Sequence, residues 1–308
     1  MGFRIAIIGS GAVGGYYGGK LAAAESDVHF LMRGDLETIK RNGLHIHGPA
    51  EQVELRTINC YNSSAQIGPC DLVLIALKAT ANHALVDLVP PLLHECTMLL
   101  TLQNGLGNEE FLAKSFGAER VLGGLCFVCL RRISRTEIQR YDYGDIVLGE
   151  YRRAAQPRTH EVAAQFRRAG IRCCVTDDLL LERWRKLVWN IPFNGLSILA
   201  GGLDTAAMLA DEALGASALA LMEEVVAAAN ACGHALGHDA IEEQMRRTAT
   251  MGSYKPSTLL DWEAGRDLEI EAIWGEPLRR ARVAGAQTPR LEIVYALLKA
   301  LVTGAKSA

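Results

Sequence analysis

The chain has 308 residues, a formal net charge of −3 and 22% charged residues. This length exceeds the roughly 250–300 residues that one hydrophobic core usually serves, so we expect two domains. A charge so close to zero excludes the strong field that draws basic proteins to nucleic acid or to anionic membranes, and it favours a small-molecule partner. The longest apolar stretches, such as 71–77 and 97–102, are too short for a membrane helix, which needs about 20 residues.

The N-terminus and the cysteines predict a cytoplasmic protein without a metal site. Met1 leads directly into the strand-like run 3–9, without the apolar region and cleavage site of a secretory signal. The eight cysteines are scattered, as in a cytosolic chain whose thiols stay reduced. Only Cys126 and Cys129 have the spacing of metal ligands, and no second Cys or His pair follows at a zinc-site interval.

Up to about residue 176, short β-branched apolar runs alternate with helical segments. The predicted strands are 5–8, 28–32, 72–77, 97–102 and 121–129. This alternation predicts an α/β fold with a parallel, doubly wound sheet that has helices on both faces. Within 138–149, the sequence Tyr-Asp-Tyr-Gly-Asp lies between strand-like runs and predicts antiparallel strands added at one edge of the sheet.

The remainder of the chain has no strand signals. Ala, Leu, Glu and Arg recur at helical spacing, which predicts a mostly α-helical C-terminal domain over 177–308. The expected breaks between its helices are 201–202, 233–237, 252–256 and 285–289. The Ala-rich helices of 206–231 fit either the core of this domain or the face of a homodimer, and the sequence leaves both open.

A glycine-rich turn follows the first predicted strand and opens a helix. It reads Gly9-Ser10-Gly11-Ala12-Val13-Gly14. In dinucleotide-binding turns of this pattern the first glycine makes the tight turn, the second lets the backbone approach a pyrophosphate, and the third permits close packing of helix on strand. Free N–H groups at the helix N-terminus would bind the phosphate. We therefore predict a Rossmann-type, NADP-binding domain over 1–176.

Three positions at strand ends bear on the cofactor. Arg33 ends the second predicted strand, where NADP proteins tend to offer arginine to the 2′-phosphate and NAD proteins place a carboxylate. This favours NADPH over NADH, although Asp35 would be the ribose ligand if the strand ran longer. Lys78 and Asn104 follow two further strands, at the edge where open α/β sheets bind ligands. Lys78 is equally well read as an exposed lysine, and Asn104 as part of an ordinary Asn-Gly turn.

A polar stripe is expected on one helix of the second domain. Lys186, Asn190 and Asn194 are spaced by four within the largely apolar segment 182–197, so they fan across roughly 80° of one helix face. A buried lysine and two buried amides need polar partners. A substrate with a carbonyl and a carboxylate would supply them. The alternative is a solvent-facing stripe with an exposed lysine.

These residues together resemble the ketopantoate reductases, NADPH-dependent oxidoreductases that act on a small 2-oxo acid in pantothenate biosynthesis. The motifs that carry the resemblance are the Gly9–Gly14 turn, Arg33, 77–79, 103–107, 183–187, Asn190, Asn194, Ser257 and 269–271.

The resemblance implies roles for several side chains. Lys186 would be the catalytic acid, and Glu269 would complete the active site. Asn190, Asn194 and Ser257 would bind the substrate, with Asn104 lying between cofactor and substrate. From the sequence alone, Ser257 would be an N-cap and Glu269 a solvated carboxylate.

Two departures from the family's pattern concern the substrate. Gly195 stands where many members have a proline, and Asp204-Thr205 falls near the place of a further substrate asparagine. A carboxylate there would repel an anionic substrate unless Thr205 took the role. The alternatives that remain are a reductase of another small branched 2-oxo acid or a related carbonyl, and a dinucleotide sensor without catalytic activity.

Overall fold

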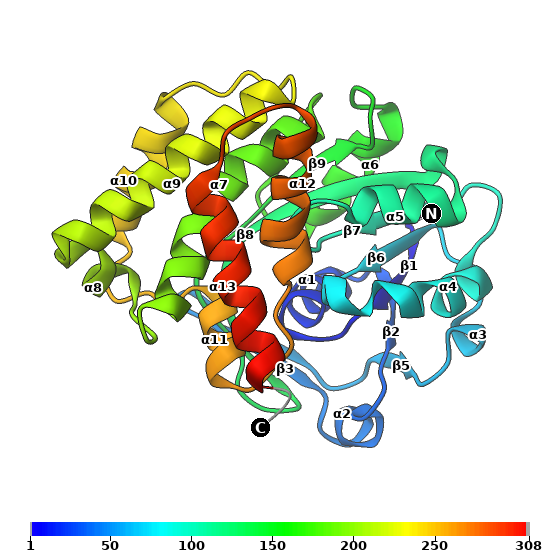
Figure 1. The fold of residues 1–308 in the computed structure, drawn as a ribbon. Coiled ribbons are helices and arrows are strands. Elements are labelled where there is room, and N and C mark those ends of the chain that lie inside the picture. The colour runs from blue at the N-terminus through cyan, green and yellow to red at the C-terminus, as the bar shows by residue number, and fades with distance from the viewer. Residues whose placement is uncertain (1, 306–308) are drawn as a thin grey trace. The chain divides into compact units, whose positions relative to one another are not determined.

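The computed structural model describes residues 2–305, which form two compact units (Figure 1). The first unit runs up to Gln103 and resumes over Asn108–Leu179, whereas the second comprises Asn104–Gly107 and the residues from Leu180 onward. The boundary thus lies three residues after the one expected from the sequence. The short segment Asn104–Gly107 belongs to the second unit although the strand before it belongs to the first.

Within the described residues, ten strands form one mixed sheet in the first unit. Their order is β4-β3-β9-β8-β7-β6-β1-β2-β5, and β10 pairs with β9. The six strands from β8 to β5 in this order are parallel to one another, which confirms the doubly wound sheet. The strands are β1 (Arg4–Ile8), β2 (Asp27–Leu31), β3 (Leu44–Gly48), β4 (Glu51–Leu55), β5 (Asn59–Tyr61), β6 (Leu72–Ile75), β7 (Met98–Thr101), β8 (Val121–Arg132), β9 (Glu137–Glu150) and β10 (Cys173–Val175).

Helices cover both faces of this sheet, as expected for strands that are buried on both sides. Alternate residues of β1 enter two different clusters: Ile5 and Ile7 pack with Phe166, whereas Ile8 packs with Leu112. The helices of this unit are α1 (Ala12–Ala23), α2 (Leu36–Asn42), α3 (Ser64–Ile67), α4 (Leu85–Leu88), α5 (Asn108–Phe116) and α6 (Pro157–Arg168).

The strands β3 and β4 form a hairpin that extends the sheet beyond β9. They were not expected from the sequence, although Leu44 and Ile46 alternate with polar residues and are both buried. The predicted antiparallel pairing is confirmed, because β9 runs antiparallel to β8. Its predicted place at the sheet edge is wrong, since β9 lies between β8 and β3. The Tyr-Asp-Tyr-Gly-Asp segment is part of β9, with positive φ at Tyr143 and Gly144.

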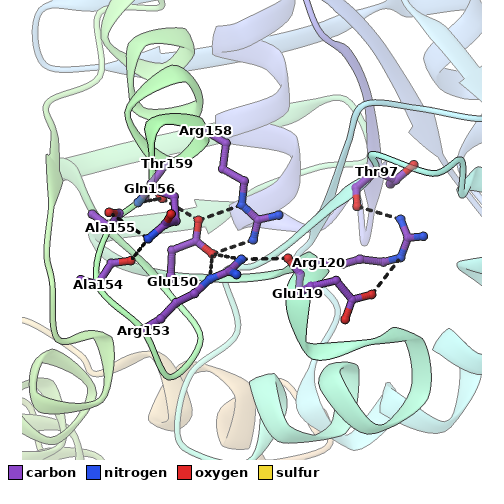
Figure 2. Close-up of polar contacts among 10 residues, drawn as sticks. All are labelled: Thr97, Glu119, Arg120, Glu150, Arg153, Ala154, Ala155, Gln156, Arg158 and Thr159. Carbon is purple, nitrogen blue, oxygen red and sulfur yellow. Dashed lines mark hydrogen bonds and ion pairs between the residues drawn. The ribbon is translucent and has the colours of Figure 1, made fainter.

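The end of β9 is joined to the start of α6 by a buried carboxylate (Figure 2). Glu150 accepts hydrogen bonds from Arg158 Nη2 at 2.6 Å, Thr159 Oγ1 at 2.7 Å and Arg153 Nη2 at 2.9 Å. Burial, the largest single effect, favours the neutral acid, but the hydrogen bonds from Arg158, Thr159 and Arg153 together outweigh it and lower the pKa of Glu150. This cluster therefore stabilises the first unit at neutral pH.

The second unit is helical, which confirms the predicted fold class. Its core contains Trp184, Val188 and Phe193 from one long helix, together with side chains of the helices that follow. Among the helices of residues 2–305, none combines the length and the apolar character needed to cross a membrane. The helices are α7 (Leu179–Leu199), α8 (Thr205–Ala210), α9 (Glu212–Ala231), α10 (Asp239–Thr250), α11 (Ser257–Glu263), a π-helical turn (Glu271–Gly275), α12 (Glu276–Val283) and α13 (Pro289–Ala305).

Candidate functional site

The Gly9–Gly14 turn has the shape that a dinucleotide requires. Gly9 has φ +99°, and a Cβ there would lie 2.4 Å from the Leu77 backbone nitrogen. A Cβ on Gly14 would lie 2.2 Å from the carbonyl oxygen of Gly9, whereas a Cβ on Gly11 would have no heavy atom within 4 Å. The turn is therefore tightly closed at Gly9 and Gly14 and open at Gly11, which fits the approach of a pyrophosphate.

The turn leads into the N-terminus of α1. Gly11 is the N-cap of this helix and has no side chain that would occupy the space in front of the first N–H groups, those of Ala12 and Val13. The Ser10 hydroxyl donates to the Leu31 carbonyl at 2.9 Å, which ties the turn to the end of β2. A helix N-terminus presented in this way favours an anion.

Two of the three predicted cofactor residues at strand ends, Arg33 and Lys78, lie in the first unit with the turn, whereas Asn104 belongs to the second. Arg33 is exposed and follows β2 by two residues, and Lys78 is exposed and follows β6 by three. Because β2 and β6 both pair in parallel with β1, their carboxyl ends lie at the edge where the Gly9–Gly14 turn begins. Asp35 is engaged in ion pairs with Arg132 and Arg135.

A polar network at the end of β7 was not singled out by the sequence analysis. Gln103 Nε2 donates to Asn82 Oδ1 at 2.7 Å, and Asn82 Nδ2 donates to Asn108 Oδ1 at 2.9 Å. Thr101 Oγ1 donates to Gln103 Oε1 at 3.0 Å. Gln103 and Asn108 flank the segment Asn104–Gly107 in the sequence, so the network lies where the chain leaves and re-enters the first unit. Its one sequence signal was the position of Gln103 directly after a strand.

In the helical unit, α7 carries Lys186, Asn190 and Asn194 on one face, as predicted. Lys186 Nζ donates a hydrogen bond to Asn104 Oδ1 at 2.8 Å. Lys186 is half-buried, whereas Asn190 is 8% exposed and Asn194 is 1% exposed. The alternative of a fully solvent-facing stripe is therefore wrong, because both asparagines are buried.

The position of Asn104 is set by the residues that follow it. Gly105 has φ +83°, and a Cβ there would lie 2.2 Å from the Ala272 carbonyl oxygen. The Leu106 N–H donates to that same oxygen at 2.9 Å. Ala272 belongs to the π-helical turn Glu271–Gly275, and turns of this kind depart from the regular pairing of helix carbonyls. The close backbone contact at Gly105 thus holds Asn104 where it meets Lys186.

The side chain of Asn194 joins α7 to α11. Its Nδ2 donates to the Asn190 carbonyl at 2.9 Å, and its Oδ1 accepts from the Thr258 N–H at 3.1 Å. Ser257 is the first residue of α11 and is exposed, while Pro256 is the N-cap. The interpretation of Ser257 as an N-cap is therefore wrong. Asn194 instead bonds to the first turn of α11, next to Ser257.

Glu269 is 6% exposed, so the sequence-based interpretation of a solvated carboxylate is also wrong. Its carbonyl accepts the Ile273 N–H at 3.0 Å, which places Glu269 at the entry to the π-helical turn. A carboxylate taken out of water in this way requires compensating partners.

The pair Asp204 and Thr205 has roles in holding the fold. Asp204 is the N-cap of α8, and its Oδ1 accepts from the Ala207 N–H at 2.8 Å. Thr205 is fully buried, and its hydroxyl donates to the Gly252 carbonyl at 2.7 Å. This position therefore presents a capping carboxylate and a hydroxyl already bonded to the loop before α11.

No group of three or more His, Cys, Asp or Glu side chains that could bind a metal ion occurs among residues 2–305. Cys126 and Cys129, the pair with metal-ligand spacing, are both buried in β8. Their side chains belong to the packed sheet.

Comparison with known proteins places the whole chain in one group. The family model described as ketopantoate reductase PanE/ApbA matches residues 5–153, and the model of its C-terminal domain matches residues 178–302. A 2-dehydropantoate 2-reductase of Nostoc sp. is 40% identical over 303 residues, which cover 97% of this chain and 95% of that protein.

Solved structures agree with this result. The crystal structure of 2-dehydropantoate 2-reductase from Geobacter metallireducens GS-15 is 45% identical with a TM-score of 0.94, covering 96% of this chain and 99% of that one. The corresponding enzyme from Methylococcus capsulatus is 35% identical with a TM-score of 0.88, covering 96% of each chain.

Proposed function

The chain belongs to the ketopantoate reductase PanE/ApbA family, and we propose that it reduces 2-dehydropantoate to pantoate with NADPH as the hydride donor. The observation that supports this most directly is the hydrogen bond from Lys186 Nζ to Asn104 Oδ1 within the helical unit. Through this bond the Asn104 amide orients the Lys186 ammonium group, which lies on the same helix face as Asn190.

The cofactor would be bound by the first unit. The open position at Gly11 and the N-terminus of α1 accommodate a pyrophosphate. Arg33 and Lys78 are exposed cations after β2 and β6, the two strands that flank β1, and they are suited to the additional phosphate that distinguishes NADPH from NADH. When bound, NADPH supplies the hydride that reduces the keto carbon.

Lys186 would protonate the keto oxygen. As the carbonyl is reduced, negative charge develops on this oxygen, and the Lys186 ammonium first donates a hydrogen bond and then a proton to it. Asn104 accepts one N–H of the ammonium and thereby fixes its direction. The carboxylate of Glu269, which is buried in the same helical unit, would keep Lys186 charged, because a negative charge beside an ammonium offsets the effect of desolvation.

The substrate carboxylate and hydroxyl would be held by Asn190 and Ser257. Asn194 contributes to this site through its carboxamide, which bonds the Asn190 carbonyl and the Thr258 N–H and so fixes Asn190 and Ser257 relative to each other. Placing the carbonyl accurately against Lys186 accounts for a large part of the rate gain in reactions of this kind.

One observation favours a second candidate, the reduction of another small branched 2-oxo acid. Near the place of a further substrate asparagine, Asp204 offers a carboxylate that caps α8, and Thr205 has its hydroxyl bonded to Gly252. Protein side chains other than an asparagine at this end of the substrate would change which 2-oxo acid fits the site, without changing the chemistry at Lys186.

A panel of 2-oxo acids, followed by the decrease in NADPH absorbance, tests the proposal. We expect 2-dehydropantoate to give the highest kcat/KM, by at least roughly tenfold, because one or two missing polar contacts discriminate to that extent. A larger kcat/KM with another branched 2-oxo acid would favour the second candidate. NADPH binding without oxidation by any member of the panel would identify a dinucleotide sensor.

A further inference from the structure

The carboxylate of Asp35 is occupied by two arginines. Its Oδ2 lies 2.9 Å from Arg132 Nη2, and its Oδ1 lies 3.5 Å from Arg135 Nε. Asp35 is the N-cap of α2, a position where an aspartate commonly accepts a hydrogen bond from its own helix. In the described chain its side chain makes no such bond, so both oxygens point to the arginines.

Arg132 also binds the phosphate-binding turn. It lies at the end of β8, and its Nη1 donates to the Ser10 carbonyl at 2.8 Å. Its Nε donates to the Ser134 carbonyl at 3.2 Å, and its Nη2 donates to the Arg135 carbonyl. Because these bonds fix the guanidinium plane, Arg132 connects the turn at Ser10 rigidly to Asp35.

The position of Asp35 in the chain relates these contacts to cofactor binding. It lies four residues after the end of β2, near the place where NAD proteins use a free carboxylate to bind the ribose hydroxyls. A free carboxylate there would also repel a 2′-phosphate. Arg132 and Arg135 are both paired with this one aspartate, and Arg33 precedes it by two residues in the chain, so these four side chains together carry a positive charge, which favours the phosphate.

We propose that Arg132 and Arg135 are positioning residues that hold and neutralise Asp35, and that this arrangement sets a preference for NADPH over NADH. This role rests on the proposed cofactor, and it explains through Asp35 why NADPH would be preferred over NADH. Arg132 exerts its effect by keeping the carboxylate away from the 2′-phosphate. Arg135, whose side chain is 68% exposed, contributes a weaker, solvent-screened part.

The test is a double-mutant cycle on the full-length protein, with Kd for NADPH and for NADH measured by fluorescence titration in the absence of substrate. We expect R132A to lower the ratio of the two affinities roughly tenfold, because it leaves Asp35 with only the exposed Arg135 as partner, at 3.5 Å. The variant D35A should leave NADPH affinity within about twofold of the native value. The double variant D35A/R132A should recover most of the lost ratio.

Arg131 provides a matched control. It precedes Arg132 on β8 and is exposed, and its side chain points to the opposite face of the strand. R131A removes the same charge from the same strand and should leave the affinity ratio unchanged. R135A removes an exposed partner of Asp35 and leaves the bond from Arg132 to Ser10 in place, and we expect it to lower the ratio by about threefold.

The outcomes separate this inference from the proposed function. A native protein that binds NADH more tightly than NADPH would contradict the proposed cofactor. A native preference for NADPH that survives both R132A and R135A would leave the proposed function intact and overturn the role of Asp35. Failure of D35A to restore the ratio in D35A/R132A would also overturn it, because Arg132 would then act directly on the phosphate.

Discussion

Replacing Gly105 with alanine should uncouple Asn104 from Lys186. The new Cβ would lie 2.2 Å from the Ala272 carbonyl oxygen and 2.4 Å from its carbonyl carbon. Both are backbone atoms of the π-helical turn, so they cannot rotate away as a side chain would. Carbon atoms normally approach to about 3.5 Å, and the segment Asn104–Gly107 must therefore retreat on the order of 1 Å from the turn.

The free-energy cost of the Gly105→Ala substitution has three parts. A positive φ for alanine costs about 1–2 kcal/mol, and loss of the Leu106–Ala272 hydrogen bond costs about 1 kcal/mol. The overpacked contact adds about 1–3 kcal/mol where the segment cannot move. Because a misplacement of 1 Å at a reacting group can reduce turnover roughly 100-fold, we expect kcat to fall by that factor in G105A.

Gly107 offers a control within the same segment. Its φ is +91°, but the nearest atom to a Cβ there would be Glu276 Cγ at 3.6 Å, an ordinary contact. G107A thus carries the backbone strain without the clash. The assay measures two quantities in both variants: kcat for the reduction of 2-dehydropantoate, and the Kd for NADPH. Equal kcat values in G105A and G107A would refute the role of the close contact with Ala272.

Three further changes have expected outcomes. N194A removes a buried amide and leaves the Thr258 N–H without its acceptor; unfolding free energy should fall by about 2 kcal/mol, and KM for the 2-oxo acid should rise more than kcat falls. E150Q removes the charge that Arg153 and Arg158 share. The unfolding free energy should fall by about 2–3 kcal/mol, less than for a fully buried ion pair because both arginines are partly exposed. Folding lowers the pKa of Glu150, so its contribution to the unfolding free energy is complete above the pKa of the unfolded state and is lost as pH falls through the folded pKa. The denaturant curves of wild type and E150Q should therefore converge in acid. R33A should raise the Kd for NADPH roughly tenfold and leave that for NADH unchanged.

Each of these three expectations can fail separately. Unchanged stability of N194A would show that α11 is held by other contacts. A constant difference between wild type and E150Q down to the acid limit would contradict the direction of the Glu150 pKa shift. Equal losses of NADPH and NADH affinity in R33A would indicate a general effect on the dinucleotide turn.

The features predictable from sequence were those that depend on neighbouring residues. The Gly9–Gly14 turn was recognisable because strand, glycine spacing and helix follow one another directly. The face of Lys186 and Asn190 was predictable because a period of 3.6 residues fixes which side chains share a helix face. Both features appear in the structure where the sequence analysis placed them.

The features that were missed depend on residues far apart in the chain. Asp35 was left as a candidate ribose ligand because nothing near it in sequence revealed the ion pair with Arg132. The contacts of Asn194 depended on the position of Thr258, and the burial of Glu269 depended on how the π-helical turn packs. The β3–β4 hairpin was missed because its short alternating run acquires buried partners only when β3 pairs with β9.

The proposed reaction depends on Lys186 as the proton donor during reduction. The most direct measurement is the single-turnover rate of NADPH oxidation with 2-dehydropantoate in wild type and K186A, together with the Kd for NADPH in each. Loss of a general acid typically reduces the rate about 10²- to 10⁴-fold, and we predict a decrease of that size with unchanged NADPH affinity. Near-normal turnover in K186A with intact NADPH binding would contradict the assignment.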